Sequence, residues 1–114
     1  MATRQRRSAG FDPDRAVRNT FDAFVAAVTG QDFGAYCALH TDLAAASLDG
    51  ELFRRNAARA VSRNLQFKLL TVVYEGALAA VTFEVTRLLG SDRERSTSTL
   101  TLLREGDRYR IAES

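Results

Sequence analysis

Hydrophobic and polar residues alternate along residues 65–113, and this period of two predicts β-strands. Turn signals interrupt the alternation at Glu75-Gly76, at residues 90–93 and at Gly106-Asp107, so the pattern predicts four strands in an antiparallel meander. Upstream, apolar residues recur every three or four positions, which predicts helices. Helices followed by a run of strands are typical of an α+β domain. We therefore expect a cone-shaped roll, with three N-terminal helices packed on one face of a curled four-stranded sheet.

The three predicted helices differ in how clearly their ends are marked. Asp12 is expected to cap the first helix, and Gly30 is expected to end it in a left-handed conformation. The second is predicted at residues 32–41 and the third at residues 51–63, with a flexible segment at residues 44–50 between them. Four arginines of the third helix lie mainly away from its apolar side and are interpreted as a solvated face: Arg54, Arg55, Arg59 and Arg63.

The predicted turns set the register of the meander and sort its side chains into two faces. They place Val72 opposite Ala79, Val81 opposite Leu102, and Leu102 opposite Ile111. The inner face, under the helices, is then apolar: Leu70, Val72, Ala79, Val81, Phe83, Val85, Leu100, Leu102, Tyr109 and Ile111. The polar residues predicted on the inner side, toward the strand ends, are Gln66, Lys68, Arg87, Ser96 and Ser98.

The opposite face of the predicted sheet carries threonines in its middle and apolar residues at one end. Cross-strand threonine pairs are an ordinary solvated surface, but a cluster of exposed apolar side chains favours a partner. We expect a homodimer that packs sheet to sheet, although scattered exposed apolar residues without a partner are an alternative. The predicted interface residues are Phe67, Leu69, Leu78, Thr82, Glu84, Thr97, Thr99 and Thr101.

Composition narrows the protein class. A chain of 114 residues is expected to form one domain, here residues 11–114, after a flexible basic tail at residues 1–10. The net charge is only +2, and no aromatic residue interleaves with the arginines of the tail, so nucleic acid is not expected as a partner. No segment is apolar enough for a membrane span or a signal peptide, and a cytoplasmic location is expected. The single cysteine, Cys37, excludes an internal disulfide.

Three segments carry a resemblance to a known family. Residues 30–33, Gly-Gln-Asp-Phe, resemble a Gly-Asp-aromatic junction between two helices, and residues 35–40 are similar to an Ala-x-Cys-Ala-Leu segment. Residues 102–111 resemble a closing motif in which Tyr109 stands where tryptophan is usual. Together they resemble the nuclear transport factor 2-like superfamily, also called SnoaL-like or cystatin-like, in its small actinobacterial members. The resemblance implies a bacterial protein with a cone-shaped fold. It does not imply one function, because the superfamily includes isomerases, cyclases, epoxide hydrolases and binding modules.

Catalytic groups are sparse in the predicted cone. The enzymes of this superfamily use inward carboxylates, whereas Glu84, the one acid central in a strand, is predicted to point outward. Tyr36 and His40 are the candidate catalytic residues, as an oxyanion donor and a proton shuttle. Cys37 with His40 as its base is an alternative, but a cysteine and a histidine on a short helix are more often core residues. No metal site is expected, because His40 is the only histidine.

Three functions follow from these observations. The leading interpretation is a non-catalytic, dimeric module that binds an apolar small molecule or acts as an accessory domain, without a cofactor. The alternatives are a SnoaL-like enzyme acting on an apolar polycyclic or polyketide substrate, and a protein-association domain whose cone is filled by phenylalanines. The predicted ligand-binding residues are Tyr36, His40, Phe83, Arg87, Ser98 and Tyr109.

Overall fold

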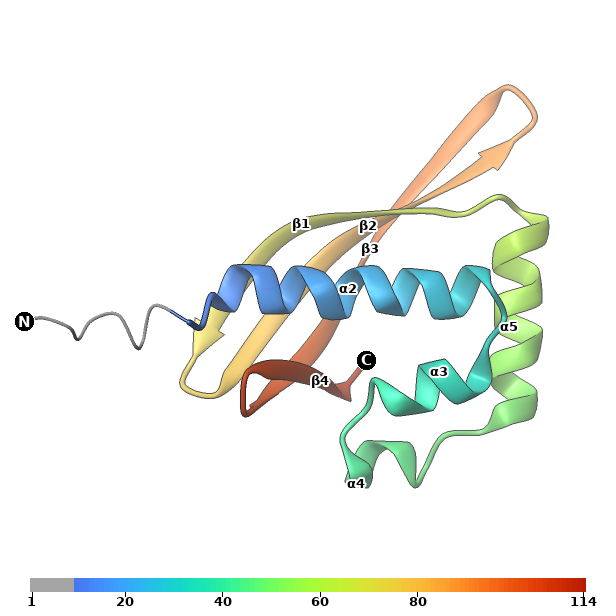
Figure 1. Cartoon of the computed structure of the whole chain (residues 1–114). Helices are drawn as coiled ribbons and strands as arrows, with labels where there is room; N and C mark the ends of the chain where they lie inside the picture. Colours follow the sequence, from blue (N-terminus) through green and yellow to red (C-terminus); the bar gives the residue numbers. More distant parts are fainter. Residues whose placement is uncertain (1–9) are drawn as a thin grey trace, which may run out of the picture.

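The computed structural model describes residues 10–114, so the predicted basic tail lies almost wholly outside the described residues. Within these residues four helices precede four strands: α2 (Pro13–Thr29), α3 (Phe33–Ala38), α4 (Asp42–Ala45), α5 (Gly50–Ser62), β1 (Gln66–Glu75), β2 (Leu78–Leu89), β3 (Asp92–Glu105) and β4 (Arg108–Glu113). The strands form one antiparallel sheet in the order β1-β2-β3-β4, and α2 lies across one of its faces (Figure 1). The predicted α+β roll is thus confirmed, with one additional short helix, α4, which begins before the segment expected to be flexible.

The ends of the helices follow from capping residues. Asp12 caps α2, and its carboxylate accepts a hydrogen bond from the Arg15 backbone N–H. The left-handed residue after α2 is Gln31, with φ of 55°, and not Gly30 as predicted. The Gln31 N–H donates to Val28 O and the Asp32 N–H to Ala27 O, which is a Schellman motif. Gly30 therefore completes the helix, and the reversal toward α3 falls one residue later.

The register of the sheet differs from the prediction at two of its three turns. Val72 pairs with Val81 and Val81 with Leu100, whereas Leu102 pairs with Ile111 as predicted. Both differences arise because the turns consist of Gly76-Ala77 and Gly90-Ser91, so each partner strand is displaced by two residues. A displacement of two leaves every side chain on its own face. The predicted inner residues of β2, β3 and β4 are consequently found on the helix side.

A β-bulge in β1 corrects the prediction for that strand. The register shifts between Leu69 and Thr71, so Leu70 is the extra residue and is 41% exposed. Before the bulge the side chains alternate in the opposite sense to the prediction. Phe67 and Leu69, predicted at the dimer interface, instead pack against the core, while Lys68, predicted to point inward, is exposed.

Aromatic side chains fill the space between α2 and the sheet. The ring centroid of Phe24 lies 6.2 Å from that of Phe21, 5.7 Å from that of Phe83 and 6.2 Å from that of Phe67, and the last two pairs meet edge to face. Such pairs contribute about 0.5–1.5 kcal/mol beyond the burial of their surface. The middle of the cone is therefore solid.

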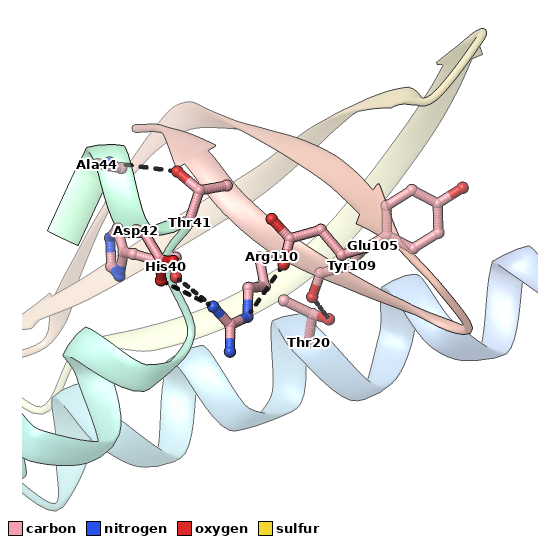
Figure 2. A network of polar contacts seen from close by, with 8 residues as sticks. All are labelled: Thr20, His40, Thr41, Asp42, Ala44, Glu105, Tyr109 and Arg110. Atoms are coloured by element: carbon pink, nitrogen blue, oxygen red, sulfur yellow. Dashed lines mark hydrogen bonds and ion pairs between the residues drawn. The ribbon is translucent and has the colours of Figure 1, made fainter.

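The free edge of β4 is joined to the helical layer. The Ile111 N–H donates to Leu39 O at 2.7 Å, and the Thr41 N–H donates to Ile111 O at 2.9 Å. On the same strand the Thr20 hydroxyl of α2 lies 2.8 Å from Tyr109 O, and the Arg110 guanidinium lies between Asp42 and Glu105 (Figure 2). These contacts place α3 and α4 beside β4, and they satisfy backbone groups that an edge strand would otherwise expose.

We predict that Thr20→Val lowers the free energy of unfolding by about 1–3 kcal/mol, because it leaves the buried Tyr109 carbonyl without its donor. Thr29→Val is the matched control, since Thr29 sits in the same helix, is exposed, and bonds only to carbonyls of its own helix. Urea denaturation of both variants tests the contrast. Equal losses in the two variants would show that the link between α2 and β4 contributes nothing.

Candidate ligand pocket

A pocket of about 450 Å³ opens between the C-terminal part of α2, helices α3 and α5, and the beginning of β1. Its walls are largely apolar, as in most small-molecule sites of comparable size. The apolar wall consists of Phe24, Val28, Leu48, Leu52, Phe53, Ala57, Ala60, Leu65 and Phe67, and the polar groups are Tyr36, Ser47, Asp49, Asn56 and Ser114. The cone is therefore filled in its middle and open beside α5.

Helix α5 forms one wall of the pocket, and both of its ends are fixed. The Asp49 carboxylate accepts the backbone N–H of Glu51 at 2.9 Å and that of Leu52 at 3.2 Å. At the other end Asn64 is left-handed, with φ of 50°, and the Leu65 N–H donates to Ala60 O. This second Schellman motif turns Leu65 back over the helix, where it lines the pocket. The wall is thus held at a fixed distance from β1.

Tyr36 is the polar side chain most closely built into the pocket wall. Its ring centroid lies 4.5 Å from that of Phe53 and 6.2 Å from that of Phe24. Burial raises the pKa of the Tyr36 hydroxyl, with Cys37 as a smaller cause in the same direction. The hydroxyl therefore stays protonated near neutral pH and can donate a hydrogen bond to a ligand.

His40 occupies a structural position beside the pocket and not in its wall. The side chain is 3% exposed, and its Nδ1 lies 2.7 Å from Tyr36 O. Because a carbonyl only accepts, Nδ1 carries the proton and Nε2 is the free acceptor, which is buried without a partner among residues 10–114. Burial lowers the pKa of the ring, so His40 is neutral in the folded protein near pH 7.

The structure brings few of the predicted ligand-binding residues together. Tyr36 lines the pocket, but Phe83 is 4% exposed and belongs to the aromatic core. Tyr109 is also buried and lies at the other end of α2, beside Phe11. Ser98 is exposed and pairs with Phe83, outside the pocket wall. Arg87 lines a separate cavity next to the pocket.

Sequence reasoning missed most of the pocket wall. Leu52, Asn56 and Ala60 repeat at intervals of four along α5 and line the pocket together. The stripe lies beside the apolar side of the helix, and its spacing alone does not distinguish a pocket wall from a core contact. Phe67 was missed for a different reason, since the bulge that turns it inward has no marker such as glycine or proline in β1.

The pocket holds little of the chemistry that catalysis needs. Among residues 10–114 the one acidic side chain in its lining is Asp49, whose Oδ1 accepts the two backbone N–H groups at the start of α5. Glu84 lies on the outer side of β2, between Lys68 and Thr97. No group of three or more histidine, cysteine, aspartate or glutamate side chains in the described part of the chain is close enough to hold a metal ion.

Comparison with known proteins bears on the fold. The sequence matches no protein-family model and no curated protein. Solved structures do match. A putative calcium/calmodulin-dependent protein kinase type II association domain from Thiobacillus denitrificans is similar with a TM-score of 0.61 and 17% identity, over 82% of this chain and 86% of that one. Within the described residues no helix is long and apolar enough to cross a membrane.

Two further structures carry the fold name or a ligand. An NTF-2 like protein of unknown function from Shewanella oneidensis matches with a TM-score of 0.58 and 14% identity, over 89% of this chain and 95% of that one. A protein with a ketosteroid isomerase-like fold from Catenulispora acidiphila, in complex with trimethylamine, matches with a TM-score of 0.53 and 14% identity, over 83% of each chain. At these identities the likeness concerns the fold alone, and it confirms the fold that the resemblance implied: this chain has the nuclear transport factor 2-like fold.

Proposed function

We propose that this protein is a non-catalytic module that binds an apolar small molecule in the pocket beside α5. The observation that carries the proposal is the combination of an open, apolar-walled cavity of about 450 Å³ with a half-buried donor packed into its wall, the Tyr36 hydroxyl. Such a cavity favours ligands with a large apolar surface and one or two acceptors. The association-domain alternative, in which aromatic residues leave no cavity, is less well supported, because the aromatic cluster fills only the space under α2.

The enzyme alternative is weaker for reasons of proton chemistry. A general base must reach the substrate and be partly unprotonated at the working pH. His40 meets the second condition but is sealed from the pocket, and Asp49 meets the first but is committed to capping α5. Tyr36 alone can polarise an acceptor, which orients a ligand without transforming it.

The outer face of the sheet supports a second element of the proposal, a homodimer. Leu70, Val73 and Leu78 are 41%, 64% and 40% exposed, and they border a row formed by Thr71, Thr82 and Thr99. On the same face Lys68 stands opposite Glu84, so two copies related by a two-fold axis can bring unlike charges together. The proposed interface therefore keeps Leu78, Thr82, Glu84, Thr97, Thr99 and Thr101, and it replaces Phe67 and Leu69 by Leu70 and Val73.

The binding proposal predicts that decanol binds saturably, at one molecule per chain, and that Asn56→Trp abolishes this binding. Asn56 is exposed at the pocket mouth, so an indole there occupies the space a ligand needs. Arg55→Trp, at the neighbouring exposed position outside the lining, is the control and should bind like the parent. Isothermal titration calorimetry measures both. The proposal fails when neither decanol nor decanoate binds saturably to the parent protein.

The dimer proposal predicts that the parent sediments as a dimer at micromolar concentration and that Thr99→Arg sediments as a monomer. Thr99 lies in the central row of the outer face, where a long charged side chain would be buried without a partner. Leu43→Arg is the control, because Leu43 is 86% exposed on α4, away from the sheet. A monomeric parent protein would contradict the proposal.

The position of His40 predicts a pH dependence of stability instead of activity. Its pKa in the folded protein is lowered below the ordinary value of about 6.5. Once the pH falls below about 6.5 the unfolded chain binds more protons at this site than the folded chain, so the free energy of unfolding decreases as the pH falls. In His40→Gln this contribution is absent. The difference in urea stability between parent and variant should therefore shrink from about pH 7 to about pH 5, and a constant difference would contradict the burial of a neutral ring.

A further inference from the structure

A second cavity, of about 290 Å³, adjoins the apolar pocket. It lies between the C-terminal half of α5 and the part of the β2–β3 hairpin that extends beyond the start of β1, which projects past the rest of the sheet in Figure 1. Asn56, Ala60 and Leu65 line both cavities. The two spaces are therefore neighbours along one wall, so one ligand can occupy both.

The second cavity differs from the first in its charge. Arg59 of α5 and Arg63, which caps the end of that helix, line it about one helical turn apart, and Arg87 lines it from β2. The single acid in its lining, Glu94, forms an ion pair with Arg87 across the β2–β3 ladder. Arg59 and Arg63 have no ion-pair partner among residues 10–114, so two positive charges remain uncompensated.

The Arg87 side chain has one hydrogen-bond donor, its Nε, that is not used within the described part of the chain. Its guanidinium is partly buried, and one terminal nitrogen pairs with Glu94. Its Nε is buried without a hydrogen-bond partner in the described part of the chain. An unpaired buried donor is costly, and an acceptor brought by a ligand would remove that cost.

We infer that the ligand of the apolar pocket is an apolar molecule with one anionic head group, a carboxylate, and that Arg59, Arg63 and Arg87 hold this head. The inference rests on the proposed binding function and adds the ligand class. The planar guanidinium matches a carboxylate with two parallel hydrogen bonds. Arg87 is half-buried, so its pairing is less screened by water than that of the exposed Arg59 and Arg63. The apolar tail extends past Asn56 and Ala60 into the larger cavity.

The distribution of arginines favours a small head group over a polyanion. Arg54 and Arg55 belong to the same helix but do not line either cavity. The positive charge is thus concentrated in a space that is continuous with an apolar wall, whereas a polynucleotide would need a stripe of charge along the surface. The net charge of only +2 agrees with a local site.

The test compares decanoate with decanol, which share the same chain length and differ in the head group. Isothermal titration calorimetry is run at low salt, below the concentrations at which either probe aggregates. We expect decanoate to bind the parent roughly tenfold more tightly than decanol, the ratio that one charge-assisted hydrogen bond provides. Added salt should reduce the ratio, because Arg59 and Arg63 are exposed and Arg87 is half-buried.

Matched variants locate the head group. Arg59→Gln and Arg63→Gln should each reduce the preference for decanoate several-fold while leaving decanol binding unchanged, and Arg54→Gln and Arg55→Gln should preserve the preference. Equal binding of the two probes to the parent overturns the inference and leaves the binding function standing. A preference that survives Arg59→Gln and Arg63→Gln places the carboxylate elsewhere and also overturns it. Absence of binding by both probes overturns the inference together with the proposed function.

Discussion

The packing of Phe24 is the contact on which the rest of the molecule depends. Its ring meets Phe21 within α2, Phe83 and Phe67 on the sheet, and Tyr36 on α3, so the main helix, the sheet and the short helix join at one side chain. A buried aromatic residue with this many partners fixes the separation of its layers, since protein interiors tolerate little empty space. The same ring forms the floor of the pocket. Phe24 therefore belongs both to the hydrophobic core and to the wall of the candidate site.

Most polar groups near the pocket are already engaged in holding the structure. Asp49 caps α5, the Ser47 hydroxyl donates to Ala44 O, and His40 donates to the carbonyl of Tyr36. A group that satisfies the backbone in this way has lost the freedom that acid–base chemistry requires. Groups that remain available line the two cavities, among them the Tyr36 hydroxyl and the Asn56 amide in the apolar one and the guanidinium groups in the charged one. This division between occupied and available groups is the basis for proposing a binding role and not a catalytic one.

The sequence predicted those features that depend on a local pattern. The alternation of apolar and polar residues placed Val81, Leu100 and Ile111 in the core, and Asp12 marked the start of α2. The sequence did not predict backbone conformations and separations that depend on contacts between different elements. Gln31 adopts a left-handed conformation beside a glycine that could have taken it, because the hydrogen bonds to Ala27 and Val28 require the reversal at that position. The pocket itself depends on how far α5 stands from β1, a distance that no local pattern encodes.

The bulge at Leu70 has a consequence for how the chain can change its length over evolutionary time. Insertion or deletion of two residues near the tip of the β2–β3 hairpin leaves every other side chain on its own face of the sheet, so the core packing is kept. Loss of the one extra residue in β1 would instead exchange the two sides of the strand before it, and Phe67 would leave the floor of the pocket for the opposite surface. The length of the hairpin can therefore change in steps of two without loss of the core, whereas the length of β1 determines which face of the sheet Phe67 occupies.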